Sequence, residues 1–193
     1  MSKSRLMCEN GVFRYACPTR GQVLLTLEGL YFLSQETQVF IENWACLNIS
    51  VISTTLITCV LAPGYGQANE VEVRAPGQGS VRRKLLSFAA PYITSISMAL
   101  CGDCSPRCPL FLADCPRKGG SPLVVAGNNF GLNALAFAQG VKMQCHTDAT
   151  SGESAAYTLL CDLPPGTGQA VGIIVIQSGG EPSQSYVPGG HCT

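Results

Sequence analysis

Charged residues and histidines are scarce in this chain of 193 residues. Asp, Glu, Lys and Arg together make up 12% of it, about half the usual share, and 12 basic side chains balance 12 acidic ones. Without a basic excess, nucleic-acid binding is not expected. The two histidines, His146 and His191, and the scattered acidic residues form no pattern for general acid–base catalysis. We therefore predict a protein that is not an enzyme and holds no cofactor.

Long apolar segments are also missing. The longest uncharged stretch, residues 43–69, is interrupted by Ser, Thr, Asn and Pro, so it is too polar for a good transmembrane helix. Residues 1–10 are polar and basic and lack the apolar core of a secretory signal peptide. We expect the chain to be a fragment of a larger protein, with any membrane attachment in other parts of that protein.

Glycine, proline and apolar residues are plentiful instead. The 21 Gly, the 12 Pro and a hydrophobic fraction of 46% favour short buried strands joined by many turns. Residues 22–27 and 55–61 are candidate strands, and residues 122–126 and 157–163 are similar segments further along the chain. No window shows an apolar stripe with helical spacing. The sequence therefore predicts an all-β fold.

Cysteine is the most informative residue type. The chain has 11 cysteines, at positions 8, 17, 46, 59, 101, 104, 108, 115, 145, 161 and 192. So many are typical of proteins from oxidising compartments. The total is odd, so at least one thiol lacks a disulfide partner within the chain. Cys192 is the penultimate residue, and we expect a partner for it outside this chain.

An internal repeat divides the chain. Residues 17–21 are matched 98 residues later by 115–119, and 59–68 are matched 102 residues later by 161–170. Cys46 and Cys145 fall between these blocks, 99 residues apart. A period of about 100 residues is one ordinary small domain. We predict an N-terminal cysteine-containing segment at 1–15, a first domain at 16–91, and a second at 92–193 that includes a cysteine-rich linker at 101–115.

The matched blocks resemble the IPT/TIG domain, an immunoglobulin-like fold shared by plexins, related growth-factor receptors and some transcription factors. The first copy carries Leu24-Leu-Thr-Leu-Glu-Gly-Leu-Tyr-Phe32 and the Pro63-Gly-Tyr-Gly66 turn after Cys59. The second carries Pro122-Leu-Val-Val-Ala-Gly-Asn-Asn-Phe-Gly131 and Cys161-Asp-Leu-Pro-Pro-Gly-Thr-Gly168. The resemblance implies two tandem immunoglobulin-like β-sandwiches.

The resemblance also implies disulfides. In extracellular members of the family, the cysteines that match Cys46 and Cys59 form a bonded pair, and the intracellular DNA-binding members generally lack it. We therefore expect Cys46–Cys59 and Cys145–Cys161 bonds and an extracellular or cell-surface location.

The cysteine-rich linker leaves two readings open. Cys101, Cys104, Cys108 and Cys115 either form two local disulfides, the reading we favour, or hold zinc through four thiolates. All four fall within 15 residues with a single C-x2-C pair, which is a weak metal pattern. In the first copy, Cys8 and Cys17 stand in the equivalent place.

Other residues carry narrower predictions. Arg82-Arg83-Lys84 is predicted to be a solvated hairpin end rather than an anion-binding patch, and residues 70–74 alternate charge with valine, which predicts one wet face. Trp44 is expected to pack over the disulfide, and His146 is expected at the surface. Asn48-Ile-Ser50 is the only N-glycosylation sequon.

These features favour a non-catalytic extracellular module that acts as a spacer or binds a protein partner, either a separate protein or neighbouring repeats of the same parent chain. The loops at residues 31–34 and 128–131 are the first candidates for a binding surface. Two alternatives stay open: an intracellular DNA-binding module like the transcription-factor branch of the family, and a carbohydrate-binding accessory domain of a larger enzyme.

Overall fold

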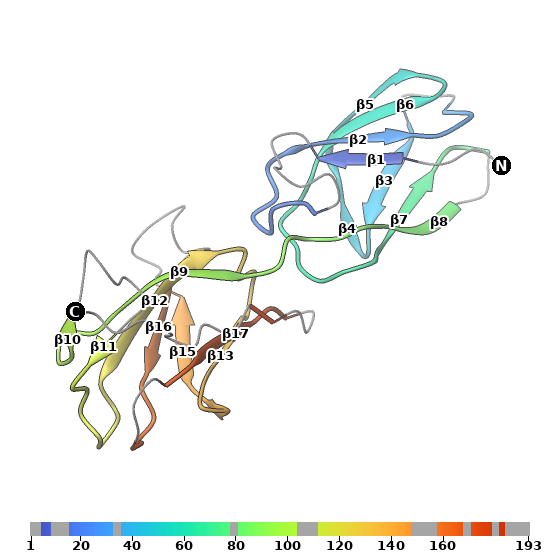
Figure 1. Cartoon of the computed structure of the whole chain (residues 1–193). Coiled ribbons are helices and arrows are strands. Elements are labelled where there is room, and N and C mark those ends of the chain that lie inside the picture. The colour runs from blue at the N-terminus through green and yellow to red at the C-terminus, as the bar shows by residue number, and fades with distance from the viewer. Residues whose placement is uncertain are drawn as a thin grey trace. The chain divides into compact units, whose positions relative to one another are not determined.

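The computed structural model describes residues 5–8, 16–32, 36–77, 81–103, 112–147, 158–167, 171–178 and 182–183. They belong to two compact units, Met1–Ala89 and Ala90–Thr193, each built from antiparallel strands (Figure 1). Across the described ranges there is no α-helix, and so no helix long enough to span a membrane. The predicted all-β fold class is confirmed.

The first unit is a sandwich of two four-stranded sheets (Figure 1). Its strands are β1 Arg5–Cys8, β2 Leu24–Glu28, β3 Gln38–Ile41, β4 Trp44–Ala45, β5 Leu47–Ser53, β6 Leu56–Val60, β7 Asn69–Arg74 and β8 Val81–Leu86. One sheet has the order β1-β2-β6-β5 and the other has the order β4-β3-β7-β8. Strands β5 and β8 are therefore edge strands of different sheets.

The second unit repeats this plan. Its strands are β9 Tyr92–Ser97, β10 Gly102–Asp103, β11 Leu112–Ala113, β12 Pro122–Asn128, β13 Leu135–Ala138, β14 Val141–Lys142, β15 Gln144–Thr147, β16 Thr158–Asp162 and β17 Ile173–Ile176. The sheets have the orders β15-β16-β12-β9 and β14-β13-β17, and β10 pairs with β11 in a separate two-stranded ribbon.

Alternation along the strands builds one apolar core in each unit. Leu25 and Leu27 of β2 are buried, as are Ile57 and Cys59 of β6, because every second side chain of a strand faces the same side. The second core has the same pattern. Its buried members are Met98, Leu123, Val125, Phe130, Ala136, Ala138, Met143, Leu159, Cys161, Ile173 and Val175.

The repeated Cys-Pro-x-x-Gly motif has a structural purpose. Its glycine, Gly21, has a φ of +64°, and a Cβ there would lie 2.5 Å from the carbonyl oxygen of Leu61. In the second unit Gly119 has a φ of +66°, and its Cβ would lie 2.6 Å from the carbonyl oxygen of Leu163. Only glycine accepts both the left-handed backbone and this close approach. Within each unit this glycine therefore packs against the backbone of the second matched block, at residues 61–63 in the first unit and 163–165 in the second.

The passage from one sheet to the other is also equivalent in the two units. The N–H of Cys46, between β4 and β5, donates to the carbonyl oxygen of Val39 at 2.8 Å. The N–H of Met143, between β14 and β15, donates to that of Ala136 at 2.8 Å. Cys145, which the sequence repeat aligns with Cys46, lies inside strand β15 instead. The backbone therefore places Met143, not Cys145, at the position of Cys46.

Strand β1 comes from residues 1–15, the segment predicted to precede the first domain. It pairs with β2 in an antiparallel ladder that runs from Arg5 opposite Glu28 to Cys8 opposite Leu25. In the second unit β9 has the same place beside β12. The first sheet thus takes an edge strand from a stretch whose sequence carries no repeated motif.

Candidate interaction surface

The described cysteines form four disulfides. The bonded pairs are Cys8–Cys17, Cys46–Cys59, Cys101–Cys115 and Cys145–Cys161. The candidate residues Cys104 and Cys108, and also Cys192, lie outside the described residues. Among the residues that are described, no cluster of His, Cys, Asp and Glu is arranged to hold a metal ion. The structure thus uses Cys101 and Cys115 as a cross-link.

A row of aromatic and charged side chains crosses the outer face of the β4-β3-β7-β8 sheet. The register sets Phe40 of β3 opposite Glu72 of β7, and Glu72 opposite Arg82 of β8. In the next row Arg74 of β7 stands opposite Gln38 of β3. Because the alternate residues of β3 and β7 face the core, these side chains all lie on the outer face.

Glu72 is buried although its side chain points away from the core. Its carboxylate oxygen Oε2 accepts a hydrogen bond from Nη2 of Arg74 at 2.9 Å and forms an ion pair with Nη2 of Arg82 at 3.2 Å. The Glu72 side chain is only 6% exposed, whereas those of Arg74 and Arg82 are 49% and 60% exposed. The prediction that one face of this strand is wet is therefore wrong at Glu72.

The Arg74 guanidinium is held on two sides. Besides its bond to Glu72, it lies over the ring of Phe40, with its central carbon 4.2 Å from the ring centroid. The hydrogen bond that Arg74 donates to Glu72 raises the pKa of Arg74 above its ordinary value, while desolvation acts in the opposite direction. We call Phe40, Glu72, Arg74 and Arg82 the arginine platform. It presents two oriented, partly exposed guanidinium groups that share one carboxylate.

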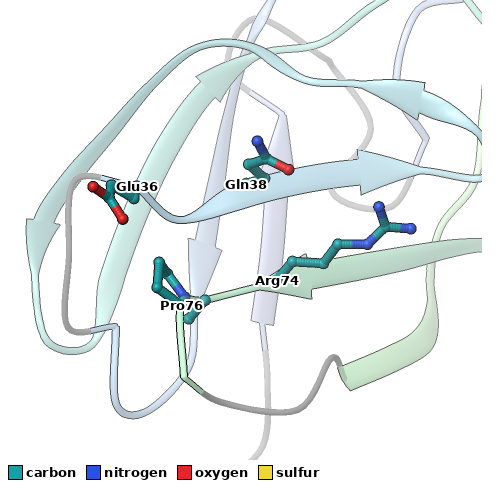
Figure 2. Close-up of a pocket in the computed structure, with 5 residues that line it drawn as sticks. Glu36, Gln38, Arg74 and Pro76 are labelled. Atoms are coloured by element: carbon teal, nitrogen blue, oxygen red, sulfur yellow. The ribbon is translucent and has the colours of Figure 1, made fainter.

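A shallow open depression of about 560 Å³ lies beside the platform (Figure 2). It is lined by Glu36, Gln38, Arg74, Ala75 and Pro76. Figure 2 shows the Arg74 guanidinium pointing away from Glu36 and Pro76, so the depression receives the stem of Arg74 rather than its charge. One carboxylate, one amide and apolar walls provide no nucleophile with an adjacent base, so this depression has no catalytic arrangement.

The second unit builds the same row without charge. Phe137 of β13 stands opposite Ile174 of β17, as Phe40 stands opposite Glu72 in the first unit. The position of Arg74 is taken by Ile176, opposite Leu135. The arginine platform is therefore a property of the first unit, although β13 and β17 of the second unit correspond to β3 and β7.

The rest of the basic run, Arg83 and Lys84, lies within strand β8 rather than in the turn that precedes it. Arg83 and Lys84 are exposed, but they belong to the edge strand that pairs with β7. The expectation for Trp44 is wrong, because its side chain is 68% exposed and therefore does not cover a disulfide. His146 lies on β15 and is exposed, as expected.

The predicted loop at residues 31–34 is only partly described, whereas the second loop and the sequon are described in full. Tyr31 is exposed with a φ of +65°, while residues 33–35 lie outside the described residues. In the second loop Phe130 is buried and only its neighbours reach the surface, so the loop offers no exposed aromatic residue. Asn48 and Ser50 are exposed on β5. The loops therefore form a weaker candidate surface than the platform.

The platform was visible in the sequence only in fragments. Arg82 belongs to a basic run, and Glu72 and Arg74 belong to the alternating stretch at 70–74. Phe40 carries no signal of its own, because its role depends on the pairing of β3 with β7. The row becomes a site only when three strands from separate parts of the chain are brought side by side.

Comparison with known proteins identifies the first unit. The model of the IPT/TIG domain family matches residues 10–88. No functionally curated protein matches the sequence significantly. Residues 10–88 therefore match the IPT/TIG domain family, which confirms the resemblance for the first of the two copies.

Several solved structures are similar to the chain. They include the surface glycan-binding protein PbSGBP-B from Prevotella bryantii, with 13% identity and a TM-score of 0.49, covering 93% of this chain and 41% of that one. The plexin A4 extracellular region has 15% identity and a TM-score of 0.37, and the match covers 92% of this chain and 17% of that one. The chain thus spans less than half the length of either protein.

Proposed function

We propose that this chain, an IPT/TIG protein over residues 10–88, works outside the cell as a non-catalytic module that binds a protein partner through the arginine platform. The second unit is a further domain of the same family. Gly119 repeats the backbone and contacts of Gly21, and Met143 repeats the inter-sheet hydrogen bond of Cys46, which supports this assignment. The observation that carries the binding proposal is the buried Glu72 carboxylate beneath two oriented arginines.

The disulfides support an extracellular location. Each unit has two of the four described bonds, and Cys46, Cys59 and Cys161 lie in the apolar cores. Reducing compartments rarely allow such bonds to persist. Mass spectrometry of unreduced peptides should recover Cys46 linked to Cys59, and Cys145 linked to Cys161. Separate alkylatable thiols at these positions would contradict the extracellular location.

The platform suits a protein partner with an acidic surface. Arginine and aromatic residues are enriched at the energetic centres of protein interfaces, and a planar guanidinium binds a carboxylate through two parallel hydrogen bonds. Glu72 and Phe40 hold Arg74 in place, so less side-chain freedom is lost when a partner binds. Arg83 and Lys84 add two exposed charges on the neighbouring edge strand. The β7–β8 hairpin thus carries four basic and two acidic side chains.

The alternative functions have less support among the described residues. A carbohydrate platform needs exposed aromatic rings on one face, whereas the exposed Tyr31, Trp44, Tyr65 and Tyr92 lie on separate elements. A DNA-binding module needs a basic excess, and the chain has none. Both alternatives are outcomes that the binding experiment below separates.

The proposal is tested with the disulfide-bonded full chain, labelled and applied to intact cells of the organism that encodes it. We expect saturable binding that is lost when the cells are treated with protease. Lys84→Glu should weaken binding about tenfold, because Lys84 stands opposite Glu70 on the outer face and its reversal places a negative charge beside the platform without touching its ion pairs. Lys142→Glu, at an exposed position of β14 in the second unit, is the matched control and should leave binding unchanged.

Three results would count against this function. Binding that survives protease but disappears after enzymatic removal of surface glycans would favour a carbohydrate ligand. Salt-sensitive binding of duplex DNA by the purified chain would favour the intracellular module. Equal losses in Lys84→Glu and Lys142→Glu would mean that bulk charge rather than the platform governs the interaction.

A further inference from the structure

Strand β5 is an edge strand without the usual protection of an edge. Its seven residues, Leu47–Ser53, contain no charged side chain and no proline, and Leu47 and Ile52 are exposed. An exposed, uncharged edge rich in β-branched residues is a template for pairing with another chain. The other long edge of this unit, β8, carries Arg82, Arg83 and Lys84, which are typical of a protected edge.

The only sequon of the chain stands at this edge. Asn48 and Ser50 are both exposed, and the ladder with β6 shifts register between Leu47 and Ser50. Asn48 lies in this bulge with a φ of +49°, a conformation that asparagine adopts more readily than most residues. The bulge leaves Asn48 and Ile49 without paired residues on β6. The acceptor amide is therefore presented to solvent from an irregular backbone rather than from a regular ladder.

The second unit shows that the bulge is not required by the fold. There the same stretch of strand, β15, pairs with β16 without interruption, with Cys145 directly opposite Cys161. The bulge explains why an asparagine is suitable at position 48. It does not explain the hydroxyl two residues later, at Ser50, which together with Asn48 completes the acceptor tripeptide.

We propose that Asn48 carries an N-linked glycan that covers the β5 edge of the first unit. This inference rests on the extracellular location proposed above, because the modification takes place in the secretory pathway. The donor is an oligosaccharide linked to a lipid pyrophosphate. The Nδ2 atom of Asn48 bonds to the anomeric carbon of the first sugar, the bond from that carbon to the pyrophosphate breaks, and the amide releases one proton.

A glycan at this position has two physical consequences. It shields exposed apolar side chains that lie within four residues of Asn48 on either side, namely Trp44, Leu47 and Ile52. It also blocks strand addition at β5, because a branched sugar next to the edge excludes an incoming backbone. Strand β8 lies in the other sheet and its platform stays free for the partner. The two edges are thus protected in different ways, one by sugar and one by charge.

The test expresses the full chain behind a cleavable secretory leader in animal cells. The secreted protein should carry one mass increment that peptide N-glycosidase F removes. Ser50→Ala should abolish the increment, Ser50→Thr should retain it, and the matched control Ser53→Ala, on the same strand outside the sequon, should retain it as well. Should Ser50→Ala fold poorly, Asn48→Asp removes the acceptor with a residue that also tolerates positive φ.

The same preparation separates the possible failures. Protein that is secreted with its disulfides formed but with an unmodified mass at Asn48 overturns the glycan and leaves the proposed function standing. Protein that stays reduced and unsecreted overturns both. Light scattering provides a second readout: enzymatically deglycosylated protein should self-associate more than glycosylated protein, and equal association would overturn the shielding of β5.

Discussion

Replacing Cys46 and Cys59 together by alanine tests how the sandwich of the first unit is held. Cys46 lies in the link between β4 and β5, where the chain passes from one sheet to the other, and Cys59 lies on β6 inside the core. Their disulfide therefore joins this inter-sheet link to strand β6. Alanine at both positions removes the cross-link while leaving no unpaired thiol. The matched variant in the second unit replaces Cys145 and Cys161, which face each other on neighbouring strands.

The loop lengths set the expected magnitude. The cysteines are 13 residues apart in the first bond and 16 in the second. In the chain-entropy model each cross-link stabilises its unit by about 3 kcal/mol, and the two values differ by only about 0.2 kcal/mol. Cys46, Cys59 and Cys161 are buried and Cys145 is partly buried, so the packing cost is only slightly smaller in the second variant. We therefore expect the two variants to lose nearly equal free energies of unfolding. This holds although the first bond joins an inter-sheet link to a strand and the second joins two paired strands.

Equilibrium unfolding in urea, followed by circular dichroism, measures these losses. With a slope of about 1.5 kcal/mol/M for a unit of this size, a loss of about 3 kcal/mol lowers the midpoint of the affected unit by about 2 M. Removing either bond should shift one transition and leave the other in place. The reasoning is refuted if either midpoint moves by less than about 0.5 M, or if the two losses differ by more than about 1.5 kcal/mol.

Two smaller substitutions test individual features of the first unit. Gly21→Ala should destabilise the first unit by about 2 kcal/mol or more in the same urea experiment, because the new Cβ meets backbone atoms at 2.5 Å. Gly77→Ala is the control: its φ is +71° but nothing lies within 4 Å of the new Cβ, so it should cost only about 1 kcal/mol. Equal costs would show that backbone conformation alone matters. Trp44→Ser should change the free energy of unfolding by less than about 0.5 kcal/mol, because the indole is largely exposed; a loss above about 2 kcal/mol would mean that the ring packs on the sandwich after all.

The fold was predictable because its determinants are local. Alternating apolar segments, frequent turns and the repeated Gly21 and Gly119 motifs each constrain a few neighbouring residues, and the family match at residues 10–88 agrees with them. Strand β1 was not predicted, since its sequence lacks clear alternation and it becomes a strand by pairing with β2. Short edge strands of this kind are specified by the partner rather than by their own residues.

The cysteine alignment shows where sequence matching reaches its limit. Cys46 and Cys145 both precede a matched cysteine, so aligning them requires only a small shift in offset. The backbone places Met143 at the position of Cys46, because hydrogen bonds at the crossing, rather than sulfur atoms, define equivalence. A disulfide depends on two side chains being close, and both the position just before β5 and a position inside β15 meet that condition.

The difference between the two units bears on which residues carry function. Phe137 and Ile174 build the row that Phe40 and Glu72 build in the first unit, so the fold does not need a carboxylate there. Burying Glu72 costs desolvation free energy, which the ion pairs with its two arginines offset without a large surplus. A fold with an apolar residue of similar size at such a position is often at least as stable. A charged row that the fold does not require and that adds little stability is best explained by what it presents to solvent. Under the proposed function we expect a partner to contact the first unit at Arg74 and Arg82, and we expect no binding through the same row of the second unit, where isoleucine stands in place of Glu72.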